Sequence, residues 1–167
     1  MINRRYAIGL VLAALPAAWL PSAAYAQQAF QRFFPFLVDL PGWKGEKPDG
    51  VSMEMPGNSM ISATRKYERD AASLDAQIVM GTAAQGALAA TRSGMHFETS
   101  DMRMSTSTID GLPVTRTYTI SSKSGAVMIA LSPNALFSLT FNGIADDEAL
   151  TLARKFDWKA MQAAQPK

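Results

Sequence analysis

Apolar and polar residues alternate most regularly between Ile109 and Ile144. Turn sequences divide this stretch into three runs rich in β-branched and aromatic residues: 112–121, 126–131 and 136–144. In the first run Val114, Tyr118 and Ile120 alternate with threonines, which predicts a strand with one buried and one solvated face. The connections are too short for a crossover, so we expect an antiparallel meander of three strands.

A helix is expected directly after this meander. Asp146 is the expected N-cap, and the helix should run to about Trp158. Acidic residues fill the first turn and Arg154 and Lys155 stand in the last, as the helix dipole favours. An apolar stripe at helical spacing predicts that the helix docks on the sheet; its residues are Ala149, Leu152, Ala153 and Phe156.

The first half of the chain is also predicted to form a meander followed by a helix. Alternation predicts strands over 51–55, 59–69 and 74–80, then an alanine-rich helix over 82–93. Gly94 suits the left-handed position that ends such a helix. Strand character resumes over residues 96–108 and continues into the meander.

The order of elements predicts one α+β domain: an antiparallel β-sheet sandwich covered by two or three helices. Neither internal repeats nor a low-complexity linker divides the chain. We assign residues 41–158 to this domain and residues 159–167 to a frayed C-terminal tail. An aromatic segment, residues 27–40, precedes the domain; we expect it to fold onto the core, the alternative being an exposed apolar arm that meets a partner or a membrane surface.

The first 26 residues have the layout of a secretory signal peptide. Arg4 and Arg5 precede a mostly apolar run, and Ala24 and Ala26 form the small-x-small pattern of a cleavage site, so we expect cleavage after Ala26. The alternative is a membrane anchor, but the run is shorter than the ~20 residues of a membrane-spanning helix. The chain has no cysteine for lipid attachment, so we expect a periplasmic or secreted protein without a membrane anchor, whether exported by the Sec or the twin-arginine route.

The net charge of the chain depends on the predicted signal segment. That segment holds two of the 16 basic residues and none of the 14 acidic ones, so the rest of the chain has a formal net charge of zero. A neutral chain gives no support to nucleic-acid binding. With no cysteine, the fold must also hold without disulfides.

Three short motifs resemble those of the PsbP/Mog1-like exported domains. They are Pro41-Gly42-Trp43, Asp110-Gly111-Leu112-Pro113-Val114 and Phe156-Asp157-Trp158, in the same order of elements over residues 41–158. The resemblance implies a small binding or accessory domain on a scaffold that commonly lacks catalysis. It implies no particular site residues.

The methionines stand out in this cysteine-free chain, with nine after Met1. Thioether sulfur and imidazole suit copper, and an exported protein without thiols would use such ligands. Methionine also fills cores and lines adaptable apolar surfaces, so core packing and a groove for an apolar ligand or partner are the alternatives. The candidate copper ligands are Met53, Met55, Met60, His96, Met102 and Met104.

Catalytic patterns are sparse. His96 is the only histidine, so an acid–base or nucleophilic site would combine it with Glu98 or Asp101. No phosphate-binding glycine loop or dinucleotide fingerprint occurs. The favoured hypothesis is an exported, non-catalytic domain without a cofactor that binds a small apolar ligand or a protein partner; a periplasmic copper protein and a small enzyme are the alternatives.

Overall fold

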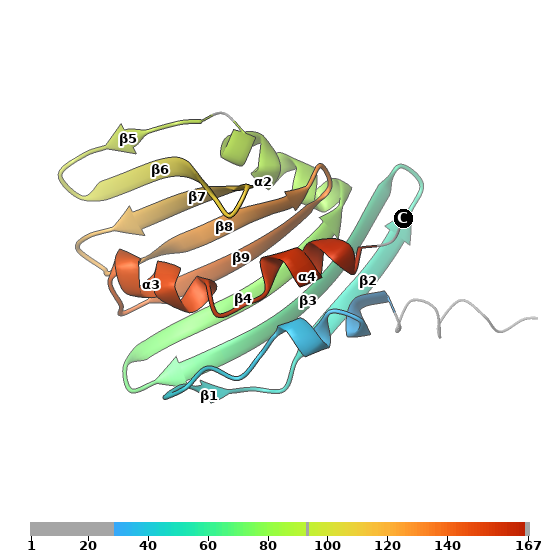
Figure 1. Ribbon diagram of the computed structural model, residues 1–167, viewed down its shortest axis with the longest axis horizontal. Coiled ribbons are helices and arrows are strands. Elements are labelled where there is room, and N and C mark those ends of the chain that lie inside the picture. Colours follow the sequence, from blue (N-terminus) through green and yellow to red (C-terminus); the bar gives the residue numbers. More distant parts are fainter. Residues whose placement is uncertain (1–28, 93, 166–167) are drawn as a thin grey trace, which may run out of the picture.

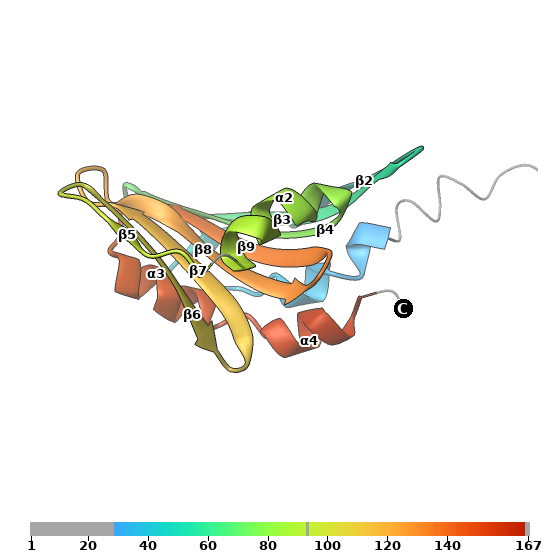
Figure 2. The same ribbon diagram turned by 90° about the horizontal axis from the view of Figure 1, so that it is seen from above.

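The alternating runs build one twisted antiparallel sheet with helices on both faces (Figures 1 and 2). The structure, a computed structural model, describes residues 29–92 and 94–165. The nine strands are β1 (Lys44–Gly45), β2 (Asp49–Met55), β3 (Asn58–Arg69), β4 (Ala72–Gly81), β5 (Phe97–Glu98), β6 (Met102–Ile109), β7 (Leu112–Thr119), β8 (Ser124–Ser132) and β9 (Ala135–Asn142). The helices are the 3-10 turn η1 (Phe34–Phe36), α2 (Thr82–Arg92), α3 (Asp146–Ala153) and α4 (Trp158–Ala163).

Both predicted meanders are present. β7, β8 and β9 pair consecutively, as do β2, β3 and β4. The sheet order is β1-β3-β4-β9-β8-β7-β6-β5, with β2 beside β1 on the outer side of β3. β9 thus pairs with β4, where Ile78 lies opposite Phe137, and this pairing joins the two meanders into one sheet. The expected α+β fold with an antiparallel sheet and covering helices is confirmed.

The main core lies on the sheet face that α3, α4 and the N-terminal segment cover (Figure 2). β9 contributes three side chains in alternation, Phe137, Leu139 and Phe141, all nearly inaccessible. Phe156, from the turn after α3, packs against Phe137 with 4.9 Å between ring centroids. Each large apolar side chain buried in this way contributes roughly 1.5–3 kcal/mol to folding.

The N-terminal aromatic segment folds onto this core, as expected. Phe33, Leu37 and Leu40 are buried. Hydrogen bonds from β3 hold the segment: the Arg65 guanidinium donates to the Leu37 carbonyl oxygen at 2.6 Å, and the Tyr67 hydroxyl donates to the Val38 carbonyl oxygen at 2.7 Å. The segment is therefore a structural part of the domain.

A smaller core lies on the opposite face under α2. Ala84 and Leu88 of this helix pack on Ala130 and Leu136. The prediction that the polar side of β7 faces solvent was wrong at Thr115, which is completely buried because α2 extends over this part of the sheet. The Thr115 hydroxyl is satisfied by a 3.1 Å hydrogen bond with Thr106.

The predicted C-terminal helix is two helices. α3 ends at Ala153, and Asp157 caps α4 by accepting a hydrogen bond from the Ala160 amide. The expected frayed tail was wrong for the first residues after Trp158, because α4 buries Met161 completely against the core. None of the helices in the described ranges is long and apolar enough to cross a membrane.

The start of α3 also differs from expectation. Ala145 occupies the N-cap position, and the Asp146 carboxylate turns instead to Arg116 on β7. Arg116 Nη2 also donates to Asp147 at 2.8 Å. These bonds to carboxylates raise the pKa of Arg116 and tie α3 to the sheet.

The region 96–108, predicted as one strand, is a short hairpin. β5 and β6 pair antiparallel, and Phe97 lies opposite Met104. Residues between the strands turn the chain because the Thr99 hydroxyl accepts a 2.9 Å hydrogen bond from the Met102 amide. Side-chain bonds of this local kind compete with a continuous strand.

Tyr67 makes the free energy of unfolding depend on pH in the alkaline range. Burial raises the pKa of its hydroxyl from 10.0 to about 12, so the folded protein holds this proton more tightly than the unfolded chain. The stabilisation is complete below the unfolded pKa and is lost as the pH rises through the folded pKa. We expect urea denaturation to show a fall of roughly 2–3 kcal/mol in unfolding free energy over this range. Tyr67→Phe should abolish the fall and Tyr118→Phe should retain it; the same fall in both variants would contradict the assignment.

Candidate functional site

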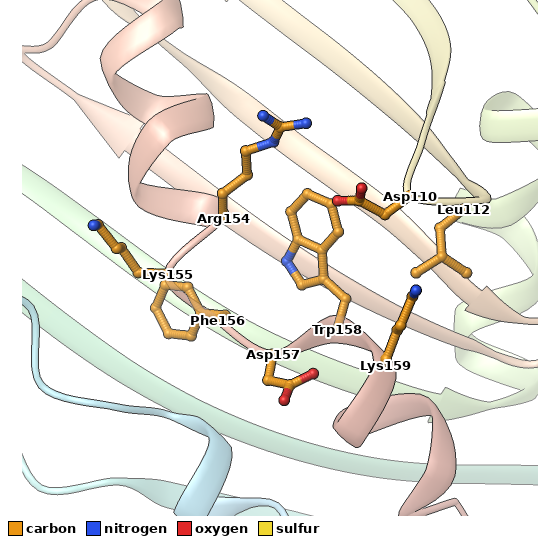
Figure 3. Close-up of a pocket in the computed structure, with 8 residues that line it drawn as sticks. All are labelled: Asp110, Leu112, Arg154, Lys155, Phe156, Asp157, Trp158 and Lys159. Carbon is orange, nitrogen blue, oxygen red and sulfur yellow. The ribbon is translucent and has the colours of Figure 1, made fainter.

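A hollow of about 550 Å³ lies where the β6–β7 turn meets the connection between α3 and α4 (Figure 3). Its volume falls in the range of small-molecule sites. We call it the linker groove. Its lining residues are Asp110, Leu112, Arg154, Lys155, Phe156, Asp157, Trp158 and Lys159.

A tight hairpin forms one wall of the linker groove. Asp110 and Gly111 both have positive φ, at 52° and 83°, and Ile109 pairs with Leu112 across them. This is the conformation that an Asp-Gly pair adopts most readily in a two-residue hairpin. The turn places the Asp110 carboxylate at the rim and leaves Leu112 largely buried.

The opposite wall and the floor come from the α3–α4 connection. Phe156 and Trp158 are 2% and 5% exposed, so they anchor this connection in the core. Trp158 Nε1 donates to the Ala153 carbonyl oxygen at 2.9 Å, which fixes the indole ring. Asp157 Oδ1 accepts from the Ala160 amide at 2.9 Å. The aromatic floor is therefore held in place before any ligand arrives.

Three basic side chains surround this floor: Arg154, Lys155 and Lys159. All three side chains are exposed, and none forms an ion pair with another described residue. The guanidinium of Arg154 makes no hydrogen bond, ion pair or ring contact within the described ranges. The other arginines whose side chains are described do make such contacts: Arg32, Arg65, Arg69, Arg103 and Arg116. With Asp110 and Asp157 counted, the lining has an excess of one positive charge.

Sequence reasoning assigned Arg154 and Lys155 to the last turn of a helix. That assignment was wrong, because α3 ends at Ala153 and both residues lie in the connection to α4. The available signal was the clustering of basic residues around the Phe156-Asp157-Trp158 motif. The same motif and the Asp110-Gly111-Leu112 motif, distant in sequence, meet in this groove.

A second, smaller hollow of about 290 Å³ lies over β3, β4 and β9. Asp75 is the half-buried carboxylate in its lining, and Lys66 lies opposite it across the strand pair. Burial raises the pKa of Asp75, against the opposing effect of Lys66. With Lys66, Glu68 and Asp75 in its lining, this hollow has an excess of one negative charge, so it suits an anion less well than the linker groove does.

The six candidate copper ligands fall into two groups at opposite edges of the sheet (Figure 1). Met53 and Met60 lie directly opposite each other across β2 and β3, with Met55 near the tip of this hairpin. His96, Met102 and Met104 lie at the β5–β6 edge. The six residues therefore do not form one site. Within the described ranges, no three histidine, aspartate or glutamate side chains are grouped to hold a metal ion.

The residues of the candidate acid–base site do not share a pocket. His96, Glu98 and Asp101 are exposed and line neither hollow. Arg103 donates to Glu98 at 3.0 Å, and the Ser121 amide donates to Asp101 at 2.9 Å. Glu98 thus joins β5 to β6, and Asp101 joins the turn of this hairpin to the β7–β8 turn. The predicted cleavage residues, Ala24 and Ala26, lie outside the described residues.

No protein-family profile, curated protein or solved structure matches this chain.

The Asp157 cap can be tested by its effect on stability. Asp157→Ala removes the acceptor for the Ala160 amide and should cost about 1 kcal/mol, the usual value of an N-cap. Asp157→Asn is the matched control, since asparagine caps equally well, and urea denaturation should place it close to the unsubstituted protein. Equal losses in both variants would mean that charge, rather than capping, matters at this position.

Proposed function

We propose that this chain is an exported, non-catalytic binding domain, and that it holds an anionic ligand with an apolar part in the linker groove. The observation that carries the proposal is the pairing of a fixed aromatic floor with basic side chains that have no partner among the described residues. The apolar part would rest on Trp158 and Leu112. The acidic group would meet Arg154 and Lys159.

The basic side chains favour an anion because their charges are not used elsewhere. The other described arginines hold the fold together through carboxylates, carbonyl oxygens or aromatic rings. A guanidinium with no such role is available for a carboxylate, phosphate or sulfonate, which it binds through charge-assisted hydrogen bonds. Lys159 extends from α4 on the side of Leu112 and Asp110 (Figure 3).

The aromatic floor favours a ligand that also has an apolar part. Preformed sites combine apolar walls with a few placed polar groups, and the buried rings of Phe156 and Trp158 supply such a wall. This refines the apolar ligand expected from the sequence into an amphipathic anion. The resemblance to PsbP/Mog1-like domains supports a binding role, and the predicted signal peptide supports export.

The probe for this site is anilinonaphthalene sulfonate, which joins an aromatic system to one anionic group. Calorimetry should detect binding to the unsubstituted protein and about tenfold weaker binding to Arg154→Glu or Lys159→Glu, because each reversal places a negative charge beside the sulfonate. Added salt should weaken binding, since the side chains concerned are exposed.

Lys47→Glu is the matched control, because it makes the same change in net charge at an exposed lysine far from the groove. It should leave the affinity unchanged. The second control is neutral anilinonaphthalene, which should bind less tightly. Equal affinity in all three charge-reversal variants, or equal binding of the neutral compound, would refute the anionic site.

A further inference from the structure

β2 is an edge strand, and in the described part of the chain only β3 pairs with it. It has seven residues, whereas β5 at the other edge of the sheet has two. Proteins commonly protect such edges with proline, lysine or shortness. Lys47 and Pro48 interrupt the edge between β1 and β2, but β2 itself contains neither residue type. β2 is thus long, and its charged residues are limited to Asp49 and Glu54.

The pairing with β3 determines which backbone groups of β2 point outward. Ser59 lies opposite Glu54, yet its amide donates away from β2, to Thr82 Oγ1 at 3.0 Å. In an antiparallel pair, residues alternate between bonding to the partner strand and pointing away from it. The amides and carbonyls of Gly50, Ser52 and Glu54 therefore point outward.

Two of these three residues are open to a further strand. The Gly50 amide donates to Asp49 Oδ1 at 2.7 Å, so a side chain of the same strand already satisfies it. The outward amides of Ser52 and Glu54 have no hydrogen-bond partner among the described residues. The open segment is short and centred on Met53.

Apolar side chains alternate with these open backbone groups. Val51, Met53 and Met55 share one face of β2 and are 45%, 44% and 50% exposed. In a strand, such i, i+2 side chains stand in a row. The row and the open backbone together form a surface suited to another extended strand of the same pattern.

We propose that β2 forms a homodimer interface, pairing antiparallel with β2 of a second copy about a two-fold axis at Met53. In this register Ser52 of each copy lies opposite Glu54 of the other, which closes four backbone hydrogen bonds. Met53 lies opposite Met53, and Val51 lies opposite Met55. All of the exposed apolar residues of β2 are then covered.

A second copy fits because the edge is complementary to itself. The two open residues are placed symmetrically about Met53, as an isologous interface requires. Glu54 meets a serine and not another carboxylate, so like charges are not opposed. Residues 27–167 have a formal net charge of zero, so two copies have no overall repulsion. Assembly ends at two copies because each β2 is consumed and β5 is too short to continue the sheet.

Sedimentation equilibrium tests the dimer over protein concentrations of about 10 µM to about 1 mM, the range of a modest interface. The unsubstituted protein should pass from monomer to dimer. Ser52→Pro should weaken association at least tenfold, because it removes an outward amide that does not serve the β2–β3 pairing. Phe97→Ser, which removes an equally exposed apolar side chain at the opposite edge, should leave the dimer intact.

Cross-linking tests the register of the dimer independently of whether the Ser52→Pro variant folds. The chain has no cysteine, so Met53→Cys introduces a single thiol. Opposed residues in this type of pair have Cα atoms about 4.5 Å apart, within disulfide reach. Met53→Cys should therefore cross-link rapidly.

Val51→Cys and Met55→Cys are the register controls. Each alone places its two thiols four residues out of register, about 13 Å apart along the strands, so each should cross-link slowly. A mixture of these two variants should form the mixed disulfide. A monomer at every concentration, or equal cross-linking rates for all three single variants, would overturn the proposal.

Discussion

The pairing of β4 with β9 is the contact on which the rest of the structure depends. Each meander alone is a small sheet with one apolar face, and neither has enough surface to bury that face well. Pairing Ile78 with Phe137 and Leu74 with Phe141 makes a single sheet broad enough to carry the main core. Only then do α3, α4 and the N-terminal segment have a continuous surface to cover. Phe156 packs against Phe137 at the centre of that surface, so the same contact also positions the connection that lines the linker groove.

Some charged residues hold the helices and strands together, and others remain available to bind a ligand. Arg65 attaches the N-terminal segment to β3, and Arg116 attaches α3 to β7. Both guanidinium groups are partly buried and bond to oxygen atoms of another element, so they fix the orientation of that element on the sheet. Arg154 has no such partner among the described residues, although it lies beside the anchored rings of Phe156 and Trp158. This difference separates a structural charge from a candidate binding charge.

Local features of the fold could be predicted from the sequence, and long-range ones could not. Alternation predicted β3, β4, β7, β8 and β9, and Gly94 has the expected left-handed φ of 64°. The β4–β9 pairing depends on partners far apart in sequence, which alternation does not specify. The burial of Thr115 depends on where α2 lies. The methionines fall into two groups along the sequence, but spacing inside a strand gives no information on which edge of the sheet that strand occupies.

The separation of β4 and β9 along the chain has a consequence for folding during synthesis. The strand that completes the central pairing comes after α2 and four further strands, β5, β6, β7 and β8. A nascent chain therefore lacks its organising contact until all of these elements and β9 have been made, and long-range strand pairing is slow to form. Until then, the apolar face of the first meander, β2 to β4, has no continuous sheet to join, so the main core can form only after β9 has paired with β4.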